Sequence, residues 1–182
     1  MVESSSLPAG TVRKPATGLS GSTTVGVIAG LGFTHVVMIP DAETRQLFDD
    51  LMVHPDIQVV SPAREGEGVA IAAGLWVGGA RPLLVLQNTG LMEAGDAIRG
   101  CGLGPRIPLR LLVGWRGYPG AMTGRLPIDS AFTYTEPILR AWGIPYRLLM
   151  EEGDIDALAD MDRIAEETSM PAAAVFGWPF RR

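Results

Sequence analysis

Short runs of consecutive apolar residues recur along the chain, and segments with helical spacing separate them. Six of these runs predict buried strands, at 35–39, 57–60, 83–86, 109–113, 146–150 and 172–176. Continuous apolar runs, unlike alternating ones, are typical of strands buried on both faces, as in a parallel sheet with helices on either side. The pattern therefore predicts an α/β fold, a three-layer α/β/α sandwich with a six-stranded, mainly parallel sheet.

Helical spacing fills most of the connections between these strands. The predicted helices span 22 or 23 to 29, 43–51, 66–77, 92–99, 132–142 and 154–167. A polar turn, Gln87–Gly90, is expected after the third strand, and a loop, Gly114–Gly120, after the fourth. Arg110 stands near the start of the fourth strand, where its guanidinium is expected to reach water.

The first 22 residues differ in composition from the rest. They are rich in Ser, Gly, Pro and Thr and have no apolar period, which predicts a flexible or loosely docked arm (1–22) ahead of one domain (23–182). No run approaches the roughly 18 apolar residues of a membrane span. The N-terminus also lacks the apolar core of a secretory signal, so a cytoplasmic location is expected.

The charge and the rare residues exclude several classes of function. A net charge of −5 gives no basic footprint for nucleic acid or an anionic membrane. Lys14 is the only lysine and lies in the arm, so the domain offers no phosphate-binding or Schiff-base lysine. Cys101 has no cysteine to pair with, and His35 and His54 have no metal-ligand spacing, so no protein-bound metal is expected.

Polar residues gather where four predicted strands end. These clusters are Pro40–Asp41, Arg64–Glu65, Gln87–Thr89 and Trp115–Arg116. In parallel α/β sheets, ligands bind beyond the carboxyl ends of the strands, so the four clusters are expected to meet at one edge and form the site.

Each residue in these clusters also has a structural interpretation. Glu65 is well placed to bond a buried ligand nitrogen, or it caps the start of a helix in solvent. Gln87 and Asn88 contact a ligand, or they form a polar turn. Asp41 faces the substrate, or it caps a turn. Arg116 binds an anionic group, or it is a surface residue.

Taken in order, these motifs resemble a known family. Pro40–Asp41, the run Arg64–Glu67 with Ala72–Gly74, Gln87–Leu91 and Gly114–Gly120 look like the pyrimidine-binding domain of phosphonopyruvate and sulfopyruvate decarboxylases, which depend on thiamine diphosphate. The resemblance covers about residues 23–178. The sequence departs from the family pattern at Ala42 and Arg64 and after Gly120, which leaves the nature of the 2-oxo acid open.

The resemblance implies a role for each candidate residue. Glu65 stands nine residues before Gly74, as the family's cofactor-activating glutamate does, whereas Glu67 does not. Glu65 is thus the expected catalytic residue, bonded to N1′ of the aminopyrimidine. Gln87, Asn88 and Thr89 are expected to bind the cofactor as well. The substrate is expected to contact Asp41, Asn88 and Arg116.

The resemblance also implies a partner. The Gly-Asp-Gly motif with a downstream Asn that holds Mg²⁺ and the diphosphate in this superfamily is absent, because Asn88 is the only asparagine. A separate beta subunit is therefore expected to hold the diphosphate and Mg²⁺, in an α2β2 or larger assembly. The expected function is the alpha subunit of a 2-oxo acid decarboxylase. The alternatives are a carboligase subunit of the same superfamily and a non-catalytic α/β binding or scaffolding module.

Overall fold

The computed structural model describes residues 18–124 and 129–182, and in it six strands form one sheet. The strands are β1 (His35–Met38), β2 (Gln58–Val60), β3 (Pro82–Gln87), β4 (Arg110–Gly114), β5 (Tyr146–Leu149) and β6 (Ala172–Phe176). Their order is β2-β1-β3-β4-β6-β5, and every neighbouring pair is parallel. The predicted sheet is confirmed, and it is wholly parallel.

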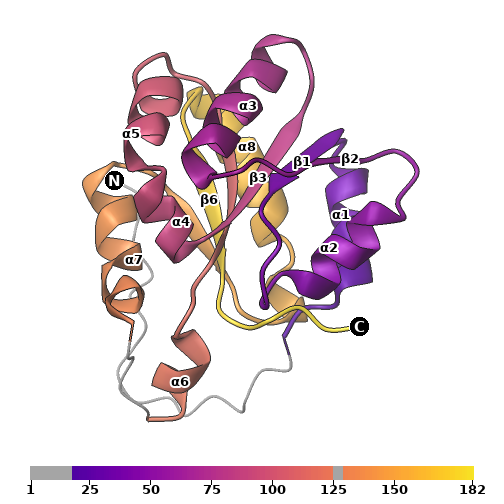
Figure 1. Ribbon diagram of the computed structural model, residues 1–182, viewed down its shortest axis with the longest axis vertical. Coiled ribbons are helices and arrows are strands. Elements are labelled where there is room, and N and C mark those ends of the chain that lie inside the picture. Colours follow the sequence, from indigo (N-terminus) through magenta and orange to yellow (C-terminus); the bar gives the residue numbers. More distant parts are fainter. Residues whose placement is uncertain (1–17, 125–128) are drawn as a thin grey trace.

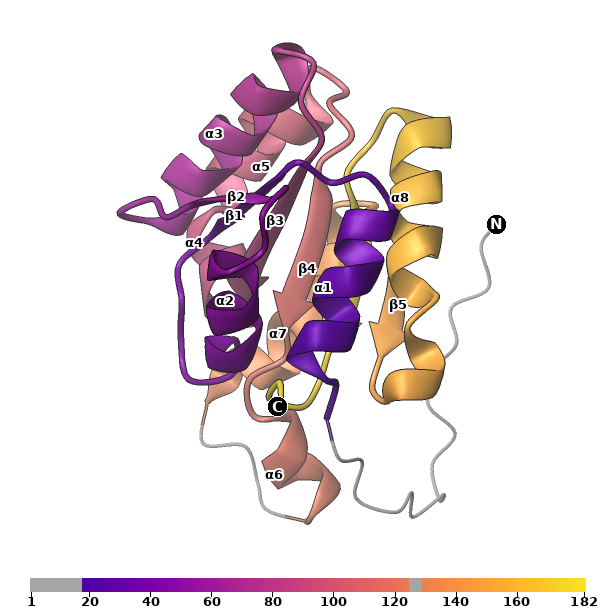
Figure 2. The same ribbon diagram turned by 90° about the vertical axis from the view of Figure 1, so that its right-hand side faces the viewer.

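Helices cover both faces of the sheet, as Figures 1 and 2 show. One face carries α1 (Gly21–Gly30), α2 (Arg45–Met52) and α8 (Ala157–Thr168). The other carries α3 (Glu65–Val77), α4 (Asn88–Glu93), α5 (Gly95–Ile98) and α7 (Ser130–Ala141), with a short π-helix at Arg99–Leu103. Two further short helices are α6 (Tyr118–Met122) and a 3₁₀ turn at Glu152–Asp154. This arrangement confirms the predicted three layers.

The core forms on both sides of the sheet because side chains alternate along each strand. In β1, Val36 packs with the α1, α2 and α8 layer, whereas Val37 packs with the α3 and α7 layer. In β3, Leu83 and Leu84 divide in the same way. Burial on both faces explains why these strands are continuous apolar runs in the sequence.

The chain before α1 is part of the domain from residue 18 onwards. Leu19 is buried, and Ser20 caps α1 by accepting a hydrogen bond from the N–H of Thr23. Backbone hydrogen bonds join Gly21 and Leu19 to Arg181, near the end of the chain. Residues 18–22 are therefore docked on the domain, as the second of the two descriptions of the arm allows. The rest of the predicted arm, 1–17, lies outside the described residues.

Two predicted connections contain helix. The expected polar turn at Gln87–Gly90 is instead the start of α4, which begins at Asn88. The expected loop at Gly114–Gly120 gives way to α6 at Tyr118. The predicted helix at 92–99 is divided among α4, α5 and the π-helix.

Arg110 was predicted to reach water, and this was wrong. It is 2% exposed and lies at the start of β4. Its guanidinium forms ion pairs with Asp162 (2.9 Å) and Glu166, both on α8, and donates to the carbonyl oxygen of Pro108. These acids neutralise the buried charge, which otherwise could not leave water.

Across residues 18–124 and 129–182, no helix is both long enough and apolar enough to cross a membrane.

The carboxyl ends of the strands lie at the bottom of Figure 1, where α6 and the C-terminus also lie. The chain passes from β1 outwards to β2 and then returns to the other side of β1 as β3. Such a change of direction separates the connections that follow neighbouring strands, and ligands of α/β folds bind in the crevice that results. The fold therefore places the candidate site between the segments that follow β1 and β3.

Candidate functional site at the carboxyl edge of the sheet

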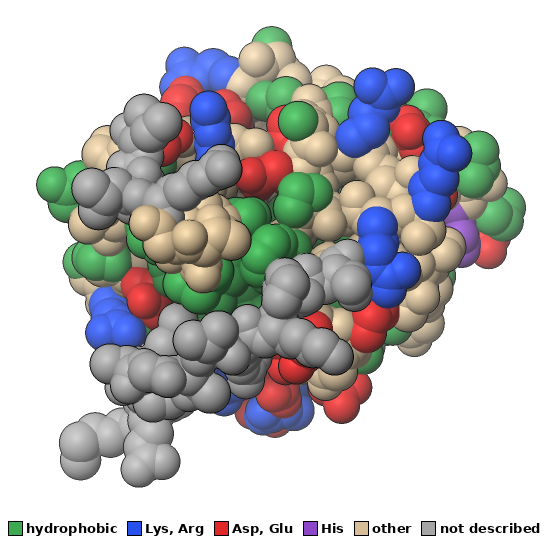
Figure 3. Space-filling model, turned by 90° about the horizontal axis from the view of Figure 1, so that it is seen from below, with side chains coloured by type: hydrophobic (Ala, Val, Ile, Leu, Met, Phe, Trp, Pro, Cys, Tyr) green, Lys and Arg blue, Asp and Glu red, His purple; other side chains and the backbone are tan. Residues whose placement is uncertain are grey.

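The four predicted polar clusters all lie at the carboxyl edge. Asp41 follows β1, Glu65 follows β2, Asn88 follows β3 and Arg116 follows β4. Seen end-on in Figure 3, this edge has apolar side chains near its middle and both acidic and basic side chains around them. The edge therefore combines an apolar floor with charged groups.

Glu65 is the first residue of α3, and its side chain packs against α4. A methyl group built on Gly90 of α4 would lie 2.6 Å from Cγ of Glu65 and 2.8 Å from Oε1. Only glycine leaves this space. The side chain is half-buried, and its carboxylate forms no hydrogen bond or ion pair with the described residues.

The first turn of α3 is tied to α4 by Glu93. The carboxylate of Glu93 accepts the backbone N–H of Gly66 at 2.8 Å and forms an ion pair with Arg64 at 2.6 Å. Both interactions lie beside Glu65 in the sequence. They fix the start of α3 on α4 and with it the direction in which Glu65 leaves the helix.

Glu67 bonds the chain just ahead of α3. Its Oε2 accepts the backbone N–H of Ala63 at 2.7 Å, two residues before the first residue of the helix. The nearby arginines pair with other acids, Arg64 with Glu93 and Arg99 with Asp96. Glu67 and Glu93 thus bind backbone N–H groups around the start of α3, and Glu65 binds none of them.

Asn88 is fully buried, and its polar atoms are bonded within the chain. Nδ2 donates to Oγ1 of Thr135 at 3.0 Å and to the carbonyl oxygen of Arg116 at 3.3 Å, while Oδ1 accepts the N–H of Thr89. Asn88 therefore joins α4, α7 and the segment after β4. Its side chain positions these elements in this structure.

Gln87 and Thr89 remain accessible at this edge. Both are half-buried, and the only side-chain bond between them is long, at 3.5 Å from Thr89 Oγ1 to Gln87 Oε1. They therefore retain hydrogen-bonding capacity for a ligand, and their role in cofactor binding stays a prediction.

Asp41 forms a local cap. Its Oδ1 accepts hydrogen bonds from the backbone N–H groups of Glu43 (2.8 Å) and Thr44 (2.9 Å) and from Oγ1 of Thr44 (3.1 Å). The turn role is thus realised, and the predicted contact with a substrate stays a prediction for the second oxygen.

Glu43 is the residue that sequence reasoning missed, because the sequence offered only a first helical position there. Its Oε2 would lie 3.3 Å from a methyl group on Gly114, the last residue of β4. The pKa of Glu43 is raised from 4.5 to about 7, mainly by burial and also by nearby Asp41, while Arg116 acts in the opposite direction. The only sequence signal was an acid two residues after a strand-end Asp.

Arg116 is the predicted site residue that is most exposed, with 56% of its side chain accessible. It faces Asp129 at a distance of 3.6 Å, an exposed pair of small energetic value. Next to it, Trp115 is buried, stacks on Phe132 and donates its indole N–H to the carbonyl oxygen of Phe132. Trp115 thus packs in the core and holds the segment that carries Arg116.

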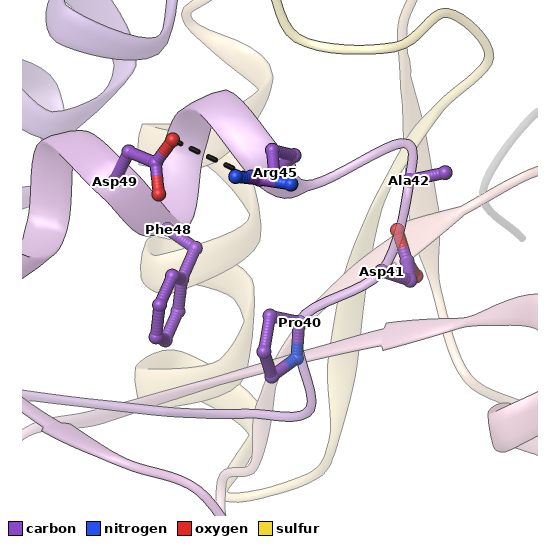
Figure 4. Close-up of a pocket in the computed structure, with 6 residues that line it drawn as sticks. All are labelled: Pro40, Asp41, Ala42, Arg45, Phe48 and Asp49. Carbon is purple, nitrogen blue, oxygen red and sulfur yellow. Dashed lines mark ion pairs between the residues drawn. The ribbon is translucent and has the colours of Figure 1, made fainter.

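A pocket of about 520 Å³ lies on the outer side of the connection between β1 and α2 (Figure 4). It is lined by Pro40, Asp41, Ala42, Arg45, Phe48 and Asp49. Arg45 and Asp49 form an exposed ion pair at its rim. Of the predicted site residues only Asp41 reaches it, so this pocket is peripheral to the cluster at the sheet edge.

Among residues 18–124 and 129–182, no three His, Cys, Asp or Glu side chains form a group that could hold a metal ion.

Comparison with known proteins places this geometry in context. No protein-family model matches the chain. It is 28% identical over 125 residues to a sulfopyruvate decarboxylase of Methanosarcina acetivorans and 32% identical over 96 residues to a phosphonopyruvate decarboxylase of Streptomyces viridochromogenes. It is 27% identical over 154 residues to the sulfopyruvate decarboxylase subunit alpha of Methanothermobacter thermautotrophicus.

The relatives of this chain are sulfopyruvate and phosphonopyruvate decarboxylases.

Coverage distinguishes two kinds of relative. The aligned part is 68% of this chain but only 32% of the Methanosarcina decarboxylase, and 53% of this chain but 24% of the Streptomyces decarboxylase. The alignment with the Methanothermobacter alpha subunit covers 82% of this chain and 92% of that subunit. The chain thus spans about a third or less of the longer decarboxylases, whereas it matches an alpha subunit over most of its length.

Proposed function

We propose that this chain is the pyrimidine-binding, alpha-type subunit of a thiamine-diphosphate-dependent 2-oxo acid decarboxylase and that Glu65 activates the cofactor. The observation that carries the proposal is that the three acids at the start of α3 make different contacts. Glu67 binds the backbone N–H of Ala63 and Glu93 that of Gly66. Glu65 is left half-buried over Gly90 with an unbonded carboxylate.

The residues present fit the pyrimidine half of the cofactor. An aminopyrimidine offers ring nitrogens and an amino group, and Glu65 offers an oxygen acceptor held at a fixed helix end. A charge-assisted hydrogen bond between Glu65 and N1′ suits a partly dry site of this kind. Gln87 and Thr89, which follow β3, supply further polar groups at the same edge.

When bound, thiamine diphosphate supplies the electron sink for the carbon that loses its carboxylate. The part played by this chain is to hold a proton at N1′ through Glu65 and to exclude water with the apolar floor of the sheet edge. The buried amide of Asn88 joins α4 to α7 and to the segment after β4, and so holds these elements in place around the proposed site.

A partner subunit is part of the proposal. The described residues include no acidic cluster for a cation, and the sequence has no Gly-Asp-Gly motif with a later Asn. In addition, the outer side of α3 is open: a methyl group on Gly74 would touch nothing within 4 Å, and Trp76 and Val77 are 37% and 70% exposed. Such an apolar helix surface suits contact with another subunit. The partner would hold the diphosphate and Mg²⁺.

For the substrate we propose a small 2-oxo acid. Two relatives are named for sulfopyruvate and phosphonopyruvate, which carry a second anionic group. Arg116 is exposed at the sheet edge and held only by a 3.6 Å pair with Asp129, so it is available to meet an anion.

The test is reconstitution with a partner chain that carries Gly-Asp-Gly and a downstream Asn. Release of carbon dioxide from 2-oxo acids is measured with and without thiamine diphosphate and Mg²⁺. Wild-type protein should require both, and Glu65→Gln should nearly abolish turnover while the two chains still co-elute in gel filtration. If the chain is instead a binding or scaffolding module, Glu65→Gln leaves the activity of the complex unchanged.

A further inference from the structure

Glu43 occupies a place that the proposed cofactor chemistry leaves unexplained. It follows β1 at the carboxyl edge, and its backbone is held on both sides. Its N–H donates to Asp41, and its carbonyl oxygen accepts the N–H of Phe180 from the C-terminal tail. The carboxylate itself forms no hydrogen bond or ion pair with the described residues. The backbone is thus fixed while the acid group is unpartnered.

The surroundings of this carboxylate come from four elements. Gly114 of β4 lies beside Oε2, and the ring of Phe176 from β6 approaches the same side of Gly114. The charged groups that face Glu43 are Asp41 on its own segment and Arg116 after β4, and Arg116 is in turn paired with Asp129. The half-buried position of the carboxyl group favours the neutral carboxylic acid.

Asp41 and Glu43 therefore differ in what they can do. One oxygen of Asp41 accepts three hydrogen bonds. The carboxyl group of Glu43 has no such donors, and nearby Asp41 raises its pKa further. Of the two neighbouring carboxyl groups, Glu43 is therefore the one suited to hold a proton and release it.

We propose that Glu43 is the proton donor of the site and delivers the proton that decarboxylation consumes. This inference rests on the proposed function. A 2-oxo acid anion, R–CO–COO⁻, takes up one proton and yields the aldehyde R–CHO and carbon dioxide. The bond between the carbonyl carbon and the carboxylate breaks, and a C–H bond forms at the same carbon. Glu43 gives up its proton in that step and regains one from water.

The first test measures the proton on Glu43 without any turnover. The full-length chain is labelled with ¹³C at the glutamate carboxyl carbons, and the Glu43 signal is assigned by its loss in Glu43→Gln and in Glu43→Asp. We expect its titration midpoint near pH 7. A midpoint near the ordinary glutamate value of 4.5 would overturn the proposal.

The second test separates proton delivery from the earlier steps. Ferricyanide, as added oxidant, removes two electrons from the carbonyl carbon, so that the 2-oxo acid yields carbon dioxide and the shorter carboxylic acid. Water supplies the new oxygen, and no C–H bond forms. In the reconstituted enzyme, Glu43→Gln should lower aldehyde formation about a hundredfold. Ferricyanide reduction should stay within about threefold of wild type, because it requires no proton on carbon.

A matched control is Glu167→Gln, an exposed glutamate paired with Arg163 at the far end of α8, which should leave both rates unchanged. Glu43→Asp keeps an acid and should restore part of the aldehyde rate. An equal loss of both rates in Glu43→Gln would assign Glu43 a structural role and overturn the proposal, as would an unchanged aldehyde rate. A wild-type enzyme without either activity would instead refute the proposed function itself.

Discussion

Gly90 lies directly against the side chain of Glu65: a methyl group at Gly90 would stand 2.6 Å from Cγ, 2.9 Å from Cδ and 2.8 Å from Oε1 of the glutamate. The contact joins the segments that follow β2 and β3. The orientation of the candidate catalytic carboxylate thus depends on the absence of a side chain on a different helix.

Gly90→Ala should therefore displace Glu65 and lower the turnover of the reconstituted enzyme. A displacement of about 1 Å from a productive geometry can cost on the order of a hundredfold in rate, and we expect a loss between tenfold and about that value. Steady-state assays with saturating thiamine diphosphate measure it.

The matched control is Gly26→Ala in α1, where a methyl group would have no neighbour within 4 Å. Alanine is favoured over glycine inside a helix, so this variant should be stabilised by about 0.5–1 kcal/mol with unchanged turnover. Equal activity of the two variants would show that Gly90 does not position Glu65.

A substitution of Asn88 tests whether this residue holds neighbouring elements together or contacts the cofactor directly. Asn88→Ala removes bonds to Thr135 and to the carbonyl oxygen of Arg116 in a fully buried site. We expect the free energy of unfolding to fall by about 1–3 kcal/mol, measured by urea denaturation of the chain. Thr89→Val, which removes a hydroxyl from a half-buried side chain with one long bond, serves as the comparison and should cost less. Unchanged stability in Asn88→Ala together with weaker cofactor binding would point to direct contact instead.

The stability of the chain should depend on the proton held by Glu43. Its pKa is raised to about 7 in the folded chain from 4.5, mainly by burial and also by Asp41, with Arg116 acting in the opposite direction. Between pH 4.5 and 7 the folded chain keeps this proton and the unfolded chain has lost it. This contribution to stability is therefore complete below pH 4.5 and is lost as the pH rises through about 7.

The loss amounts to at most about 3 kcal/mol, reduced by solvent at this half-buried group. Urea denaturation of wild type and Glu43→Gln at several pH values isolates it, because all other groups are shared. Wild type should lose stability relative to Glu43→Gln between pH 4.5 and 7, and a constant difference between the two would contradict the raised pKa.

The buried charge at the opposite edge of the sheet gives a prediction about stability alone. Asp162 pairs with both Arg110 and Arg81, and Arg110 is 2% exposed. Asp162→Asn leaves Arg110 with Glu166 as its only acidic partner, and it should cost about 3 kcal/mol in thermal or urea unfolding. Asp160→Asn, in exposed pairs with Arg163 on the same helix and with Arg147, should cost under about 1 kcal/mol. Similar losses in the two variants would show that the burial of Arg110 does not matter.

The sequence predicted those features that local pattern determines. Both ends of β6 were predicted correctly, because its residues form one apolar run between a Pro and a Gly. The shared edge of the strand ends followed from parallel pairing alone. The start of α4 could not be predicted in this way. Its first residue, Asn88, is buried and donates a hydrogen bond to Thr135, 47 residues later, and no local pattern indicates that contact.

Other features depend on pairs that are distant in the sequence. Arg110 is buried because Asp162 and Glu166, 52 and 56 residues later, neutralise it. The position of Glu43 depends on two other strands. Its carboxylate lies beside Gly114 of β4, and the ring of Phe176 of β6 approaches the same glycine. Glu65 was found from the sequence, but Gly90, against which it packs, was not. Nothing within a short window distinguishes such partners from ordinary turn residues.

The most direct measurement of the central claim is the exchange of the C2 proton of thiamine diphosphate in the reconstituted complex, followed by NMR after transfer to D₂O. Glu65→Gln is compared with Glu67→Gln, which removes a neighbouring acid whose carboxylate is bonded to the backbone N–H of Ala63. We predict that Glu65→Gln slows the exchange at least about a hundredfold and that Glu67→Gln leaves it near the wild-type rate. Exchange in Glu65→Gln as fast as in wild type would contradict the account.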